Sequence, residues 1–117
     1  MNPLTAYGQW LADAPADWPD AAMIAAHHAF IDTLGVAVRG AREPLVPRVL
    51  ASVESWGQGP SLVIGANASL PAPFAALVNG TAAHALDFDD NFDPAKAHAS
   101  AVLVPTILAL ADQLNSS

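Results

Sequence analysis

Side chains that exchange protons near neutral pH are concentrated in one short part of this chain, residues 84–100. This stretch holds four of the 11 acidic residues, two of the four histidines and the single lysine, and it lies between two apolar segments. Its polar members are His84, Asp87, Asp89, Asp90, Asn91, Asp93, Lys96, His98 and Ser100. Imidazoles and carboxylates are the usual groups of general acid–base catalysis, so proton transfer is the chemistry that this stretch could perform.

Part of this stretch belongs to a helix that we predict to begin near residues 71–73 and to end at about Phe88. Gly80, His84 and Asp87 stand at positions i, i+4 and i+7 of that helix, which places them on one face. A glycine lets a ligand approach the backbone closely. The face therefore combines room for a ligand with a base and an acid.

His98 comes just before a second helix, which we predict to open at Ser100 or a neighbouring residue and to end near Leu114. Pro105 lies too deep for the first turn, so we expect a kink or a later start. Helix N-termini bind anions through free backbone N–H groups and the helix dipole. A carboxylate substrate held there would meet His98 as general acid or base and Asp87 as its partner.

A calcium site of the EF-hand type is a first alternative. Asp87, Asp89 and Asn91 fit ligand positions 1, 3 and 5 of that loop. Phe92 stands in place of the required glycine and His98 in place of the bidentate glutamate. The pattern thus lacks both the turn and the strongest ligand, and we predict no metal.

A second alternative is the magnesium motif DDxxD of prenyl and terpene synthases, which Asp89, Asp90 and Asp93 match literally. Such short patterns arise easily in an acidic loop. Pro94 also ends the helix on which the motif should lie. A fragment of such a synthase remains a remote alternative.

The simplest alternative involves no chemistry at all. The acidic loop would be a solvated turn, and His84 would be a histidine hydrogen-bonded in the core, as buried polar side chains generally are. Against this interpretation stands the coincidence of Gly80, His84 and Asp87 on one face, with His98 shortly after them.

Composition narrows the class of protein. With 117 residues, 53% hydrophobic and 13% charged, the chain should form a single domain over residues 1–117 with a buried core. The net charge of −7 makes nucleic acid and anionic membranes poor partners. Only Arg39, Arg42, Arg48 and Lys96 are cationic, so a site for a polycarboxylate would borrow positive charge from elsewhere.

Signals of location are few. The chain contains no cysteine, which excludes disulfides and thiolate catalysis and suits a reducing compartment. The N-terminus lacks the basic and apolar regions of a signal peptide. The longest apolar run, residues 99–111, is shorter than the ~20 residues of a membrane span. We therefore expect a cytoplasmic protein without a membrane segment.

Hydrophobic spacing predicts an all-α, bundle-like fold with at most one short extended segment. The expected helices cover residues 4–13, residues 19–39 with Asp17 as N-cap, and residues 44–56, followed by the two helices described above. The extended segment falls at residues 61–65.

Two of these helices have apolar sides that should face the core. In the second helix this side is formed by Met23, Ile24, His27, Phe30, Ile31, Leu34 and Val38, with small residues opposite. We expect that helix to be buried on more than one face, with Gly35 allowing close approach of a neighbour. In the third helix Leu45, Val49, Val53 and Trp56 should point inward.

Several segments together resemble one known family. They are residues 75–90, which end in Asp87-Phe-Asp-Asp90, then His98-Ala-Ser100 and residues 105–112, preceded by residues 32–37 and 61–65. In this order they resemble the MmgE/PrpD family of dehydratases, decarboxylases and epimerases. The resemblance covers nearly the whole chain.

The resemblance implies the N-terminal part of a helical domain without the second, lid-like domain. It implies a cofactor-independent lyase or epimerase, similar to 2-methylcitrate dehydratase, that transfers a proton next to a carboxylate of a di- or tricarboxylic acid. By resemblance Asp87 and His98 would be catalytic, and Asn91 would line the site where the family often has threonine. With the spacing argument, His84, Gly80, Lys96 and Ser100 complete the expected substrate-binding residues.

Family members are several times longer, and their later segments supply further catalytic groups. The chain would then be part of a lyase that needs a larger partner chain or a homo-oligomer to complete its site. The alternative is a non-catalytic helical module of the same descent, used for assembly. Few charges and broad apolar helix faces favour a partner in either case.

Overall fold

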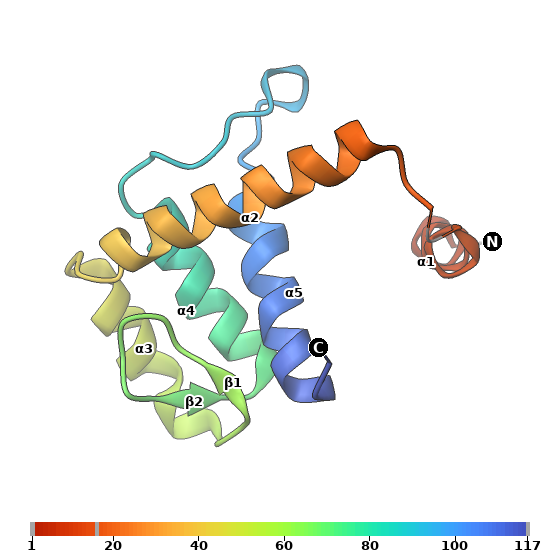
Figure 1. Ribbon diagram of the computed structural model, residues 1–117. Helices are drawn as coiled ribbons and strands as arrows, with labels where there is room; N and C mark the ends of the chain where they lie inside the picture. The colour runs from red at the N-terminus through yellow and green to blue at the C-terminus, as the bar shows by residue number, and fades with distance from the viewer. Residues whose placement is uncertain (1, 16, 117) are drawn as a thin grey trace.

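The computed structural model describes residues 2–15 and 17–116. It confirms the predicted helical fold, with five α-helices and one two-stranded sheet among these residues. The helices are α1 (Pro3–Asp13), α2 (Asp20–Gly40), α3 (Leu45–Val53), α4 (Ala72–His84) and α5 (Ser100–Leu114). The shorter elements are the 3-10 turns η1 (Glu54–Trp56) and η2 (Asp93–Ala95) and the strands β1 (Ser61–Leu62) and β2 (Ser69–Leu70). In Figure 1, α4 lies at the centre, α2 crosses α4 and α5, and α1 stands apart.

The core is built around α4, whose sequence is rich in small residues. Its buried residues are Ala72, Ala75, Val78, Asn79, Ala82 and Ala83. Alanines allow neighbouring helices to approach closely. At Gly40, α2 lies so close to α4 that an added Cβ would be 2.0 Å from the Ala82 carbonyl oxygen. The expectation for Gly35 was wrong, because nothing lies within 4 Å of a Cβ at that position.

A second close approach joins α4 to α5. Pro105 lies inside α5, and because proline has no N–H, the carbonyl of Ala101 lacks its usual partner one turn later. A Cβ on Gly80 would lie 2.9 Å from that same carbonyl oxygen. The helix nevertheless begins at Ser100, so the start near Ser100 was predicted correctly and the alternative of a later start was wrong. Gly80 thus has a packing role between two helices.

Helix α2 differs from the prediction at its start and in its burial. It begins at Asp20 with Pro19 at the N-cap position, and no side chain caps it, so Asp17 is not the cap. Its buried residues are Thr33, Ala37 and Gly40, near the C-terminal end. The expectation that several faces are buried is wrong for this chain.

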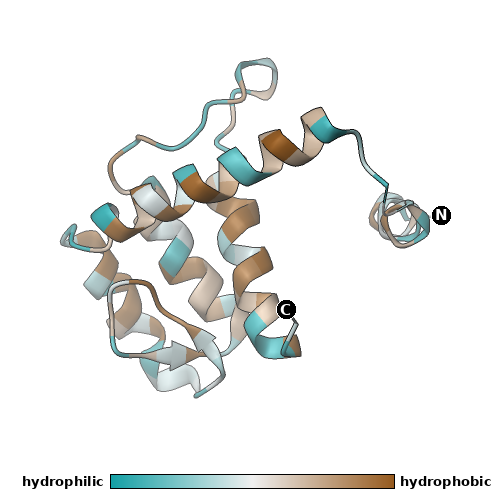
Figure 2. Ribbon diagram, viewed as in Figure 1, coloured by the Kyte–Doolittle hydropathy of each residue, from teal (hydrophilic) through white to brown (hydrophobic). Residues whose placement is uncertain are grey.

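The apolar side of α2 is instead exposed. Ile24, Ile31 and Val38 are 54%, 70% and 61% exposed, and Figure 2 shows apolar turns along this helix. By length and composition α2 is also apolar enough to cross a membrane, a test that a core helix passes as well. In the most apolar 18-residue stretch of α2, 11% is buried in this structure.

Helix α3 contacts the core through part of the predicted stripe. Val53 is buried and Val49 packs against the core, as predicted, and Val46 is buried as well. Leu45 and Trp56 were also expected to point inward, but they are 54% and 65% exposed. Trp56 lies in the 3-10 turn after the helix, where the change of pitch moves it off the inward face. Its ring meets Phe74 edge-on, with centroids 5.2 Å apart.

The extended segment predicted at residues 61–65 is one half of a small hairpin. β1 pairs antiparallel with β2, with Ser61 opposite Leu70 and Leu62 opposite Ser69. The second strand was not predicted. The buried Asn79 side chain holds the hairpin to α4, since it accepts from Ile64 N at 2.8 Å and donates to Leu62 O at 2.9 Å.

Candidate active site

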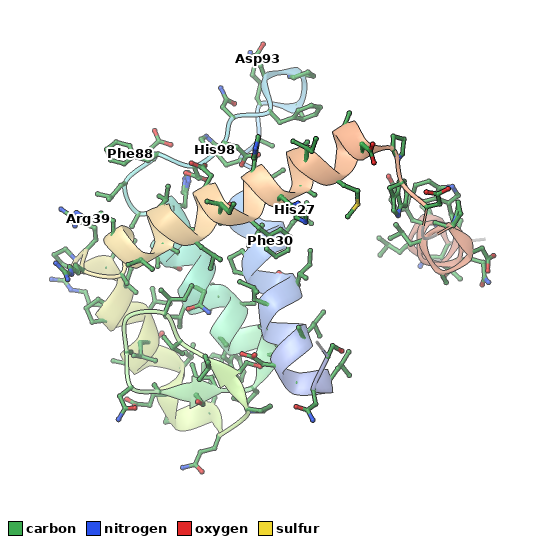
Figure 3. The ribbon with its side chains drawn as sticks, in the orientation of Figure 1. His27, Phe30, Arg39, Phe88, Asp93 and His98 are labelled. Carbon is green, nitrogen blue, oxygen red and sulfur yellow. The ribbon has the colours of Figure 1, made fainter. Side chains whose placement is uncertain are left out.

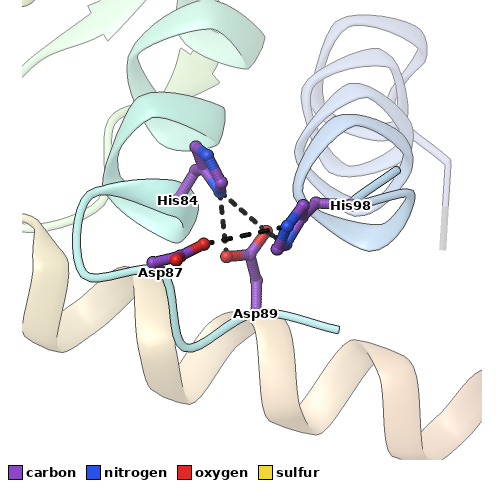
Figure 4. A group of neighbouring side chains, drawn as sticks. All are labelled: His84, Asp87, Asp89 and His98. Carbon is purple, nitrogen blue, oxygen red and sulfur yellow. Dashed lines mark hydrogen bonds and ion pairs between the residues drawn. The ribbon is translucent and has the colours of Figure 1, made fainter. Parts of the chain in front are cut away.

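The candidate site forms where the last residue of α4 meets the segment that leads into α5. Helix α4 ends at His84 rather than at the predicted Phe88. The chain then passes through the acidic loop and returns to place His98 beside His84. The two rings meet edge to face with centroids 4.8 Å apart, and Figure 4 shows them with Asp87 and Asp89.

Asp89 lies between the two imidazoles. Its side chain is fully enclosed, and its two carboxylate oxygens lie 3.0 and 3.1 Å from Nδ1 of His84. Oδ2 also lies 3.3 Å from Nδ1 of His98. This second pair is within ion-pair distance but too bent for a hydrogen bond, so Nδ1 of His98 is buried without one. A buried carboxylate is costly without partners, and the two imidazoles are the partners here.

Asp87 approaches His98 from the opposite edge of the ring. Its Oδ1 lies 3.7 Å from Nε2 of His98, and its side chain is 77% exposed. Asp87 adopts a left-handed conformation with φ 55°, while its N–H donates to the His84 carbonyl at 3.0 Å. Aspartate tolerates this conformation better than most residues. The predicted pair Asp87 and His98 is therefore brought together. The prediction that Asp87 shares a helix face with Gly80 and His84 was wrong, because Asp87 lies in a turn beyond the end of α4.

A groove of about 840 Å³ opens beside the two histidines. It is lined by Leu45, Pro73, Ala76, Leu77, Gly80, Thr81, His84, Ala85, Lys96, Ala97, His98, Ala101, Val102 and Thr106. Four of the predicted site residues, Gly80, His84, Lys96 and His98, thus border one hollow. Asp87 contacts His98 but is not among the lining residues.

The remaining predicted site residues, Ser100 and Asn91, lie elsewhere. Ser100 is buried and bound to Asp90, whose Oδ1 accepts from Ser100 N at 3.0 Å and whose Oδ2 accepts from Ser100 Oγ at 2.8 Å. The N-terminus of α5, where we expected a substrate carboxylate, is thus capped by a carboxylate of the chain itself. Asn91 is exposed and does not line the groove.

The three carboxylates of the DDxxD pattern do not converge. Asp89 faces the histidines, Asp90 caps α5, and Asp93 pairs with Lys96 on the exposed tip of the loop (Figure 3). A magnesium site of the synthase type needs these groups on one helix face around one ion. The geometry thus argues against that alternative.

A different set of side chains could hold a cation. His84, Asp87, Asp89 and His98 each offer one donor atom, and these atoms lie within 4.8 Å of one another. Two imidazoles and two carboxylates are donors that Zn²⁺ accepts. In the described structure the same atoms pair with one another, and the prediction of no metal stays a prediction.

The sequence pattern predicts neither the role of Asp89 nor that of Asp90. Both belong to one acidic run, but Asp89 is buried and Asp90 binds the first residue of α5. Asp90 lies ten residues before Ser100, and the residue at the N-cap position of α5 is Ala99, so no local N-cap pattern in the sequence indicates this contact.

Comparison with known proteins gives one family. The MmgE/PrpD N-terminal domain model matches residues 7–117. The mouse cis-aconitate decarboxylase is 33% identical over 86 residues, which is 72% of this chain and 17% of that protein. The human enzyme of the same name is 44% identical over 62 residues, 53% of this chain and 11% of that protein.

A cis-aconitate decarboxylase-like protein of Aspergillus oryzae is 27% identical over 105 residues, which is 88% of this chain and 22% of that protein. The chain therefore spans about a fifth or less of the length of these relatives. No solved structure gives a significant match.

Proposed function

The chain belongs to the MmgE/PrpD family, and we propose that it forms part of the active site of a cofactor-independent lyase or epimerase. The proposed substrate is a di- or tricarboxylic acid, and the proposed reaction moves a proton at a carbon atom next to a carboxylate. Dehydration, decarboxylation and epimerisation of such acids all include this step.

The observation that carries the proposal is the position of His98. Its ring borders the groove and lies between Asp87, 3.7 Å from Nε2, and Asp89, 3.3 Å from Nδ1. An imidazole with a carboxylate on either side can take up a proton, because both carboxylates stabilise the resulting cation. We assign His98 the proton transfer and Asp87 the stabilisation of its charged form.

The groove suits a carboxylic acid only in part. Its cationic residue is Lys96, beside His84 and His98, and most of the other lining residues are apolar. A tricarboxylate, the class of acid named in its relatives, needs more positive charge than this. We propose that a longer partner chain or a second copy supplies the other cations and catalytic groups, consistent with the fraction of its relatives that the chain spans.

Exposed apolar side chains support a second candidate, a non-catalytic assembly module. Ile31, Val38 and Leu103 are 70%, 61% and 57% exposed, so the outer faces of α2 and α5 could bind another protein without any chemistry. The two candidates differ in what happens at the groove. An enzyme part depends on His98, whereas an assembly module does not.

The proposal is tested by measuring the turnover of cis-aconitate and of 2-methylcitrate. The assay uses this chain in complex with a second chain that carries the remaining part of an MmgE/PrpD protein. Size-exclusion chromatography first establishes that the complex forms. Turnover that is lost with His98→Ala supports the enzyme, provided that the complex still forms. A complex that forms but turns over neither acid nor any related di- or tricarboxylate supports the assembly module.

A further inference from the structure

Asp89 is the one fully enclosed carboxylate of the candidate site, and neither the spacing argument nor the family resemblance gave it a role. Its oxygens lie 3.0 and 3.1 Å from Nδ1 of His84, and Oδ2 lies 3.3 Å from Nδ1 of His98. Both rings thus turn the same nitrogen toward one acceptor. The other nitrogen of His98, Nε2, lies on the side of Asp87.

We propose that Asp89 is a positioning residue, which holds both imidazoles in the tautomer that carries its proton on Nδ1. A carboxylate only accepts hydrogen bonds, and a neutral imidazole has a single N–H. When that N–H faces Asp89, the lone pair is on Nε2. In His98, Nε2 lies 3.7 Å from Oδ1 of Asp87, which is too far for a hydrogen bond. The lone pair on Nε2 of His98 is therefore free to take a proton.

The bent contact between Asp89 and His98 fits this role. Nδ1 of His98 is enclosed and has no hydrogen-bond partner in the described structure, and Asp89 is the carboxylate beside it, at 3.3 Å. Catalytic hydrogen bonds are often long or misaligned in the free enzyme and tighten when substrate binds. A small rotation of the ring aligns the N–H with Oδ2. The catalytic value of this arrangement rests on the proposed function, but the tautomer itself does not.

Its neighbours in the loop show that the role is specific to Asp89. Asp90 faces away and binds Ser100. Asp93 lies on the exposed tip and pairs with Lys96. Asp93→Asn therefore removes one negative charge from the same loop without touching either histidine, and it is the matched control.

The tautomers can be measured directly by NMR of the 117-residue chain, with ¹⁵N in the histidine rings and at a pH where the rings are neutral. We expect the signals of His84 and His98 to show a protonated Nδ1 and an unprotonated Nε2. In Asp89→Asn the amide has one accepting oxygen and one donating NH₂ group for two rings, so at least one histidine should move its proton to Nε2. Asp89→Glu, which keeps the carboxylate, should restore the tautomer, and Asp93→Asn should leave it unchanged.

Several results would overturn the proposal. One is a wild-type His98 that carries its proton on Nε2, a measurement that needs no variant to fold. Another is an Asp89→Asn protein, folded by circular dichroism, in which both tautomers persist. In the complete enzyme the same substitution should lower kcat by roughly 10- to 100-fold with little change in KM, which is the range known for partners that orient metal-binding histidines. If the tautomers are as expected but His98→Ala leaves turnover intact, the proposed function fails and the role of Asp89 in holding the rings stands.

Discussion

Nε2 of His98 lies 3.7 Å from Oδ1 of Asp87. Asp87 belongs to the turn that follows α4, and His98 comes just before α5. Asp87 is 77% exposed, and ion pairs of exposed groups contribute little to stability because water screens them. The contact therefore has little structural value. It does place an accessible carboxylate beside an imidazole that borders the groove, and the proposed proton transfer rests on this arrangement.

The cap on α5 should be measurable as stability. Asp90→Ala removes both hydrogen bonds from Ser100 and leaves its N–H, the first of the helix, without that acceptor. We expect the free energy of unfolding to fall by about 1 kcal/mol, the typical value of an N-cap. Urea denaturation followed by circular dichroism measures this. An equal loss with Asp93→Ala, which removes an exposed charge of the same loop, would contradict a specific role of the cap.

Two glycines inside helices should respond oppositely to alanine. At Gly80 the added Cβ would lie 2.9 Å from the Ala101 carbonyl oxygen, so α4 and α5 must move apart, at a cost of about 1–3 kcal/mol. At Gly35 nothing lies within 4 Å, and alanine should stabilise the helix by roughly 0.5–1 kcal/mol. Thermal or urea unfolding of the two variants gives the comparison. Similar shifts in both would show that the close contact at Gly80 is not tight.

The exposed side of α2 should matter for assembly and not for folding. Ile31 is 70% exposed, so Ile31→Glu should change the free energy of unfolding by no more than about 0.5 kcal/mol. If this face binds a partner chain or a second copy, the same change should weaken that association, because it places a charge in an apolar interface. Sedimentation of wild type and variant measures the effect, and Asp20→Glu on the same helix is the control. Unchanged association would place the interface elsewhere.

Removal of divalent metal should leave the proposed activity intact. His84, Asp87, Asp89 and His98 could hold a cation, but the proposed proton transfer needs Nε2 of His98 free of metal, and the proposed tautomers need Asp89 to accept from both imidazoles. We expect turnover of the complete enzyme to be unchanged after dialysis against EDTA and to fall when Zn²⁺ is added. Loss of activity in EDTA, restored by one metal, would instead make these four side chains a metal centre.

The sequence predicted the helices well because their apolar spacing and their Pro and Gly boundaries are local signals. It predicted poorly which faces are buried, since burial depends on neighbours: Ile31 has the pattern of a core residue and is exposed in this chain. The turn after His84 was missed because the helical pattern continues to Phe88, whereas the chain leaves the helix at Ala85.

The site shows the same division. The concentration of histidines and aspartates in residues 84–100 indicated where chemistry could occur, and Asp87 and His98 do meet. The different fates of Asp89 and Asp90 depend on how the loop folds back, because adjacent residues of an extended loop point to opposite sides. Only the structure shows that the first lies between two imidazoles and that the second caps a helix.

The proposed role of His98 and Asp87 is tested most directly by the rate at which the complete enzyme that contains this chain turns over a tricarboxylate. The rate is measured for the wild type, for His98→Ala and for Asp87→Asn. His98→Ala should lower kcat by about 10²- to 10⁴-fold, the range expected when a general acid–base group is lost. Asp87→Asn should lower kcat as well, because the charged form of His98 loses a partner, and the helical circular dichroism should be unchanged in both variants. His28→Ala, at an exposed position of α2, should retain the wild-type rate. Wild-type turnover in both the His98 and the Asp87 variant would contradict the assignment of proton transfer to this pair.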